Sequence, residues 1–188
     1  ETKRLMYSDP SAWRALLEKL TAVLAEFAAQ QVEAGADVIQ IFDSWVGALS
    51  VHDYREHVLP WAKSLVKQVQ ARGVPVIYFG VDTATLLPSM RETGADVIGL
   101  DWRIPLDAGR QAVGDSFAVQ GNLDPIALFA PEAVLHSRVE EILRQAGGVP
   151  GHIFNVGHGI VPGTPVENVQ RVVRWVREIC AEQKAQSV

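Results

Sequence analysis

The sequence predicts an α/β fold in which the chain supplies about five carboxyl-terminal β/α units of a (β/α)8 TIM barrel. Five short apolar runs alternate with segments of helical periodicity, a pattern typical of a parallel sheet built from right-handed crossovers. No glycine-rich phosphate loop follows any run, which disfavours a nucleotide-binding doubly wound sheet. A closed barrel needs eight strands and about 250 residues. The 188 residues hold only five units and open on a helix, so we interpret 1–188 as part of one barrel domain.

The order of the elements follows from periodicity and from the residues that interrupt it. Ser8-Asp9-Pro10 is typical of a helix start, and Gly35 ends the apolar periodicity that follows. The residues GADVI occur at both 35–39 and 94–98, which we interpret as shared turn chemistry, a glycine ending a helix before a strand. We expect strands near residues 37, 75, 97, 117 and 152, and helices over 10–34, 51–71, 85–93, 106–113, 131–145 and 164–182.

Bulk composition excludes several classes of protein. A net charge of -5 with scattered Lys and Arg argues against a nucleic-acid surface. The lone Cys180 excludes an internal disulfide framework and fits a reducing compartment. No apolar run approaches the roughly 20 residues that span a bilayer, and the first residues lack the apolar core of a signal peptide. We therefore expect a cytoplasmic protein that binds neither nucleic acid nor membrane.

Polar residues gather where the predicted strands end, and barrel enzymes place their working groups at these carboxyl ends. His158 is the first candidate, because it stands between Gly157 and Gly159, where a histidine has little use as a helix cap. We expect Ser44, Asn122 and His158 to line one face of one cleft. The other polar or aromatic strand-end residues are Asp43, Asp82, Thr83, Asp101, Trp102, Asp124 and Asn155.

Several of these residues have simpler roles. Asp82 and Asp124 are expected to cap the helices that follow them, and Thr164 is expected to cap the last helix, with Pro165 at its first position. The remaining histidines lie on predicted helices or loops and are expected to be solvated: His52, His57, His136 and His152.

No dedicated metal site is predicted, because no H-x-x-x-H, H-x-C or C-x-x-C spacing occurs. Ser44, His158 and an aspartate could in principle form a Ser-His-Asp hydrolase site. The sequence around Ser44 lacks the G-x-S-x-G pattern, so this signal is weak.

Four segments together resemble uroporphyrinogen decarboxylase, in the same order and at similar spacing. They are FDSW at 42–45, GLDW at 99–102, QGNLDP at 120–125 and FNVGHGIVPGTPVENV at 154–169. The segment KRLMYSDP at 3–10 is also similar to one midway through that enzyme, so the resemblance covers essentially the whole chain. It implies a (β/α)8 barrel, usually a homodimer, that needs neither a metal nor an organic cofactor.

The resemblance also implies a reaction, the conversion of uroporphyrinogen III to coproporphyrinogen III by loss of four acetate carboxyl groups in haem biosynthesis. In the family, an aspartate faces the pyrrole nitrogens, and arginines and a tyrosine bind carboxylates; all of these precede the matched segments. Ser44 and His158 match family substrate contacts, and Phe42, Asp43 and Asn122 are further candidates. We expect the amino-terminal part of the same barrel as a partner and expect 1–188 alone to be inactive.

Two alternatives stay open. Zinc- and corrinoid-dependent methyltransferases of the same superfamily carry H-x-C at one strand end, where this chain has YFGVDT at 78–83, and a cysteine near His158, whereas Cys180 lies on a predicted helix. The other alternative is a non-catalytic barrel fragment that binds a tetrapyrrole or a protein partner.

Overall fold

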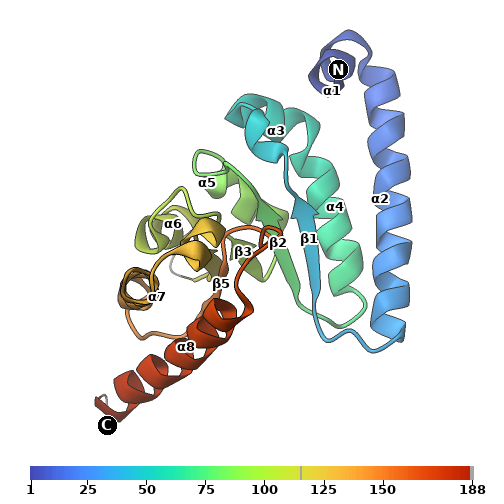
Figure 1. Ribbon diagram of the computed structural model, residues 1–188. Helices are drawn as coiled ribbons and strands as arrows, with labels where there is room; N and C mark the ends of the chain where they lie inside the picture. Colours follow the sequence, from blue (N-terminus) through green and yellow to red (C-terminus); the bar gives the residue numbers. More distant parts are fainter. Residues whose placement is uncertain (115, 187–188) are drawn as a thin grey trace.

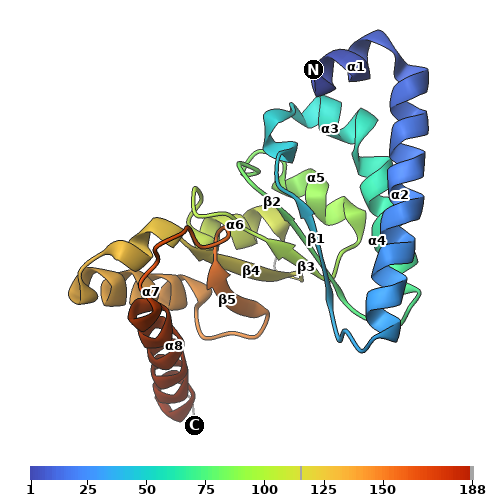
Figure 2. The same cartoon turned by 45° about the vertical axis from the view of Figure 1, so that its right-hand side comes forward.

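A computed structural model describes residues 1–114 and 116–186. Its centre is one parallel sheet of five strands, which lie in the same order in space as in the sequence (Figures 1 and 2). A doubly wound sheet would instead reverse its strand order at a switch point. The prediction of an α/β chain with five units of a barrel is therefore confirmed. The strands are β1 (Ile39–Asp43), β2 (Val76–Gly80), β3 (Val97–Gly99), β4 (Ala118–Leu123) and β5 (His152–Val156).

Helices connect the strands, because parallel neighbours need a long crossover connection, which is usually helical. In Figures 1 and 2, α2 and α4 run side by side next to β1, far from α7 and α8. The helices are α1 (Thr2–Ser8), α2 (Pro10–Glu33), α3 (Val51–His57), α4 (Leu59–Gln70), α5 (Leu87–Met90), α6 (Leu106–Val113), α7 (Glu132–Ala146) and α8 (Val166–Gln186), with short 3-10 turns η1 (Val46–Ala48), η2 (Arg91–Thr93) and η3 (Pro125–Phe129). Within the described residues, none of them is long and apolar enough to cross a membrane.

The two faces of the sheet differ sharply in burial. Register aligns Ile41 with Tyr78 and Tyr78 with Ile98, and residues aligned in this way point to the same face. This face packs on the helices, and Tyr78 and Ile98 are almost completely buried. On the opposite face, Phe42 is aligned with Phe79 and remains 67% exposed. The helix-covered face is thus the core, and the other face is largely open.

Proline explains a difference from the predicted helix over 51–71. The structure has two helices there, α3 and α4, which meet at Val58. Pro60 has no N–H to donate and its ring obstructs the preceding turn, so it begins a new helix instead of continuing the old one. The predicted helix start at Ser8-Asp9-Pro10 is confirmed: α2 begins at Pro10, and the Asp9 carboxylate caps it by accepting the N–H of Ala12 at 3.0 Å.

The predicted cap of the last helix is wrong. The Thr164 hydroxyl donates to the carbonyl of Val161 at 2.7 Å and so closes the preceding turn. The first helical N–H groups, of Asn168 and Val169, instead donate to the carbonyl of Pro165, and α8 begins at Val166. The short elements α1, η1 and η3 lie outside every predicted helix, because they hold too few residues to show a periodicity.

Candidate active site at the strand ends

A cavity of about 180 Å³ lies on the open face of the sheet, toward the carboxyl ends of the strands. It brings together two predicted site residues, Phe42 from β1 and His158 from the loop after β5. Its wall contains aromatic and aliphatic groups beside neutral polar ones, and no Lys, Arg, Asp or Glu. The lining residues are Gln40, Phe42, Phe79, Leu100, Gln120, Asn155, Val156, His158 and Gly159.

Sequence reasoning missed the two glutamines of this cavity. Gln120 is 7% exposed and its Nε2 donates to Oε1 of Gln40 at 3.2 Å, so that the amides link β4 to β1 across the open face. The two-residue period of a strand could have found Gln40, because that period places Gln40 on the same face as Phe42. An apolar run interrupted by one amide was instead interpreted only as a buried strand.

His158 is exposed and has few restraints of its own. Its ring Nδ1 lies 3.4 Å from the carbonyl oxygen of the next residue, Gly159. The imidazole also makes an edge-to-face contact with Trp102, with ring centroids 6.0 Å apart and an interplanar angle of 86°. An imidazole in this position can donate a hydrogen bond to an anionic group that enters the cavity.

Asp43 and Ser44, at the end of β1, lie outside the lining of this cavity. The Asp43 carboxylate accepts a hydrogen bond from the Tyr78 hydroxyl at 2.8 Å, and burial raises the pKa of Asp43 while that hydrogen bond opposes the rise. Asp43 therefore belongs to the face that packs on the helices. Ser44 is half-buried, and its hydroxyl has no hydrogen-bond partner among the described residues.

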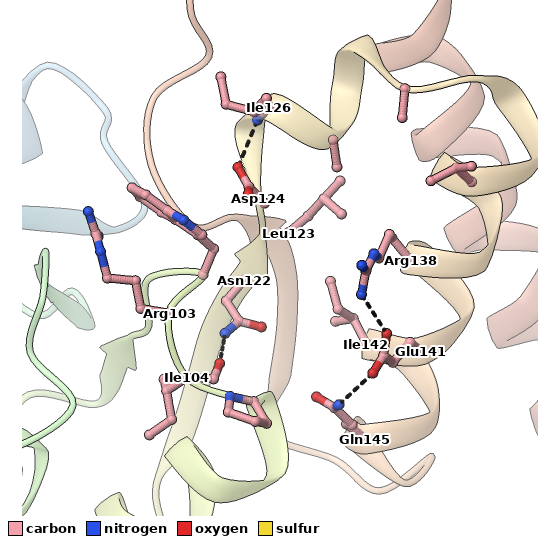
Figure 3. Close-up of a pocket in the computed structure, with 15 residues that line it drawn as sticks. Arg103, Ile104, Asn122, Leu123, Asp124, Ile126, Arg138, Glu141, Ile142 and Gln145 are labelled. Atoms are coloured by element: carbon pink, nitrogen blue, oxygen red, sulfur yellow. Dashed lines mark hydrogen bonds and ion pairs between the residues drawn. The ribbon is translucent and has the colours of Figure 1, made fainter.

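Asn122 lines a different and larger cavity of about 510 Å³, between the end of β4 and α7 (Figure 3). It is 6% exposed, and its amide donates to the carbonyls of Asp101 at 2.8 Å and Ile104 at 2.6 Å. Asn122 thereby fastens the loop after β3 to the end of β4. The structure does not bring Ser44, Asn122 and His158 into one cavity.

Asp101, at the end of β3, joins several strand ends. Its carboxylate is 1% exposed and accepts the backbone N–H groups of Asp82 and Arg103 and, at 2.8 Å, the guanidinium of Arg103. Asp82 has a φ of 60° and its backbone donates to Asp101, so the prediction that Asp82 caps a helix is wrong. Asp124 does act as predicted, since it accepts the N–H of Ile126 at 2.8 Å at the start of η3.

Glycine is required at one of the two positions beside His158. A Cβ added to Gly157 would lie 2.5 Å from the backbone nitrogen of Trp102 and 2.9 Å from the carbonyl carbon of Asp101. A Cβ added to Gly159 would meet no atom within 4 Å. The backbone before His158 is therefore pressed against the end of β3, and the backbone after it is open.

His152 differs from its prediction as a solvated residue. It lies on β5, half-buried, with its Nε2 2.8 Å from the carbonyl oxygen of Gly121 on β4. Desolvation, helped by the charge of Arg110, lowers the pKa of His152, although the hydrogen bond to Gly121 opposes this change. Because a carbonyl oxygen can only accept, Nε2 of His152 donates this hydrogen bond within the sheet. Across the described residues, no group of three or more His, Cys, Asp or Glu side chains is arranged to hold a metal ion.

Five parallel β/α units in sequential order, with polar groups gathered at their carboxyl ends, define this chain as part of an α/β barrel. The family model described as uroporphyrinogen decarboxylase (URO-D) matches residues 1–179. The chain belongs to the uroporphyrinogen decarboxylase family.

Curated relatives agree with this placement, and a solved structure agrees with the fold. The chain is 62% identical over 183 residues to a uroporphyrinogen decarboxylase of Koribacter versatilis, covering 97% of this chain and 52% of the relative. It is 53% identical to the enzyme of that name from Sorangium cellulosum, covering 95% and 51%. The chain thus spans about half the length of the curated relatives it matches. A methyltransferase from Methanosarcina mazei superposes with a TM-score of 0.85 over 95% of this chain and 52% of its own, but at 21% identity it shows the fold alone.

Proposed function

We propose that this chain forms the carboxyl-terminal half of a uroporphyrinogen decarboxylase, which converts uroporphyrinogen III to coproporphyrinogen III. The observation that carries the proposal is the identity of 51–62% to proteins of that name along 94–97% of the chain. In each of four steps, a carbon–carbon bond breaks, the acetate carboxyl leaves as carbon dioxide, and a proton takes its place to leave a methyl group.

The composition of the 180 Å³ cavity supports the proposal that the two halves of the barrel contribute different groups to the active site. The reaction needs a proton donor that makes the pyrrole an electron sink, and cations or hydrogen-bond donors that hold several carboxylates. This cavity offers an imidazole and neutral amides but no charged side chain. We infer that His158 donates to a substrate carboxylate and that Phe42 packs on the macrocycle. The aspartate and arginines that the family resemblance implies would come from the amino-terminal half.

The open sheet supports the proposal that the amino-terminal part of the same barrel is a partner of these residues. Both outer strands, β1 and β5, have an unpaired edge within the described sheet. Phe42 is 67% exposed and Ile153 is 43% exposed on the open face. Edges and apolar groups of this kind promote association. We propose that the complete protein is a cytoplasmic homodimer, as the family resemblance implies, and that 1–188 alone is inactive.

The test supplies the missing half. Residues 1–188 are fused to the remaining, amino-terminal half of the Koribacter versatilis relative; we call this fusion the completed barrel. Chromatography of the reaction products is expected to show loss of uroporphyrinogen III and formation of coproporphyrinogen III, with partly decarboxylated intermediates between them. Residues 1–188 alone, and the relative's half alone, serve as controls and are expected to show no turnover.

The activity of the completed barrel distinguishes the decarboxylase from the two alternative functions. A folded completed barrel that binds uroporphyrinogen without turnover, while the intact relative is active, would favour the non-catalytic fragment. A completed barrel that binds stoichiometric zinc and transfers methyl groups would favour the methyltransferase. Either result would overturn the decarboxylase proposal.

A further inference from the structure

The His158 side chain has few contacts that would fix its orientation. The residue is exposed, glycines flank it on both sides, and its ring has a single long hydrogen bond to its own neighbour. A side chain with so little local restraint occupies several rotamers, and each rotamer places the ring nitrogens differently. A binding group needs a defined position, so some neighbouring group has to hold this imidazole.

Trp102 is the side chain that meets this need. Its indole contacts the His158 ring edge-to-face, with centroids 6.0 Å apart. Edge-to-face pairs of this spacing are favourable, because the positive edge of one ring meets the negative face of the other. Among the described residues, this is the aromatic contact of His158, and it comes from a different strand end.

Trp102 is itself held in place from two sides. The guanidinium carbon of Arg103 lies 4.0 Å from the indole centroid, a cation–π distance. Arg103 in turn pairs at 2.8 Å with Asp101, whose side chain is buried. The backbone of Trp102 is in close contact with Gly157, the residue before His158. Indole and imidazole therefore share one rigid base, the contact between the ends of β3 and β5.

We propose that Trp102 is a positioning residue for His158: it holds the imidazole at the rim of the cavity, while Arg103 and Asp101 hold the indole. The catalytic meaning of this role rests on the proposed decarboxylase function, but the contact itself does not. Trp102 does not line the 180 Å³ cavity. Its effect on substrate acts through His158.

The first test reads the imidazole directly. Histidines in the completed barrel are labelled with carbon-13, and His158→Gln identifies the His158 ring signal by its loss. Trp102→Leu is expected to move that signal, because the ring current of the indole disappears, and to leave the other four histidine signals of residues 1–188 in place. Trp102→Phe keeps an aromatic ring and should retain part of the shift. Trp61→Leu, on α4, is the matched control.

The second test reads function through a double-mutant cycle. Trp102→Leu is expected to lower kcat/KM by about two- to tenfold, the range that corresponds to loss of one edge-to-face pair. The effect should appear mainly in KM, and Trp102→Phe should restore part of it. In a His158→Ala background, Trp102→Leu should cost little more, because residues that act through one another are not additive.

Each result decides one question. An unchanged His158 signal in both Trp102 variants overturns the positioning role, whether or not the completed barrel is active. Additive losses of activity in the cycle also overturn it, since a purely structural tryptophan would act independently of His158. An inactive completed barrel with the expected signal changes would overturn the decarboxylase proposal and leave the contact established.

Discussion

An aspartate lies shielded from bulk water at the carboxyl end of β1 and another at that of β3, but the two carboxylates accept hydrogen bonds from different kinds of donor. Asp43, the last residue of β1, accepts from the neutral hydroxyl of Tyr78, which in turn accepts from Tyr54 at 3.4 Å. Asp101, after β3, accepts two backbone N–H groups and the guanidinium of Arg103. The β3 end is thus fixed by charge and backbone, whereas the β1 end can change its protonation without losing an ion pair. The rigid end is the one that supports His158.

The largest loss of stability should follow from removing the hydrogen bonds that Asp101 accepts at the end of β3. Asp101→Asn removes the partner of Arg103 and replaces one acceptor oxygen with an amide that cannot accept a backbone N–H. Asp101 is buried although Arg103 is not, so the main cost is a backbone N–H left without its acceptor. This loss is expected to lower the free energy of unfolding of the completed barrel by about 3 kcal/mol, measured by urea denaturation. Asp37→Asn is the control, because Asp37 is exposed, and should change stability by less than about 0.5 kcal/mol. Equal effects would show that the Asp101 network contributes little.

The two strand ends should also differ in their effect on activity. His158→Ala removes one hydrogen bond to a charged group and is expected to slow coproporphyrinogen formation by about ten- to a hundredfold. Intermediates that retain some acetate groups should accumulate in altered proportions, because each turn of the substrate presents a different carboxylate. Ser44→Ala, at the β1 end, should cost less than about tenfold. Single-turnover measurements check both. A loss of many thousandfold at the first decarboxylation would identify His158 as the essential acid instead.

Glycine-to-alanine substitutions test how tightly the backbone is packed on either side of His158. Gly157→Ala places a Cβ 2.5 Å from the nitrogen of Trp102 and should lower the free energy of unfolding by about 2 kcal/mol through overpacking. Gly159→Ala, two residues along, meets no atom within 4 Å and should change it by less than about 0.5 kcal/mol. Thermal and urea unfolding of both variants decide the matter. A neutral Gly157→Ala would mean that the ends of β3 and β5 separate easily.

The smallest effect concerns pH at the β1 end. Burial raises the pKa of Asp43 in the folded state, so the folded protein binds this proton more tightly than the unfolded chain does. The resulting stability is fully present below the unfolded-state pKa of about 4 and is lost as pH rises through the folded-state pKa. Asp43→Asn should remove this fall from the pH dependence of unfolding. Tyr78→Phe should steepen it, because the Tyr78 hydrogen bond opposes the rise in pKa. Identical profiles for all three proteins would contradict the assignment.

Sequence patterns predicted the sheet well because strands and helices have different periods. The alternation of apolar runs with helical segments, each ended by a glycine such as Gly35 or Gly94, was sufficient for five parallel strands in order. The break between α3 and α4 was missed, although Pro60 was there to indicate it. Short elements such as α1 and η3 carry too few residues for any period to appear.

The candidate site was predictable only in part. The strand-end rule directed attention to His158 and the family resemblance to Phe42, and both line one cavity. The position of a residue at a strand end does not determine the direction of its side chain. That direction depends on the geometry of the following loop and on the hydrogen-bond partners within reach. Asn122 is turned toward two loop carbonyls, and Asp43 toward Tyr78. These partners are distant in sequence, so no local pattern could reveal them.

The close approach at Gly157 also limits how this region can diverge. Any residue other than glycine there has to push apart the ends of β3 and β5, whereas residue 159 can accept a side chain without moving the backbone. A lineage that alters the chemistry of this rim can therefore exchange the side chain at 158 or its aromatic neighbour at 102 one substitution at a time. Gly157 can be replaced only after an earlier change has moved the ends of β3 and β5 apart, so its substitution depends on the order in which other changes occur.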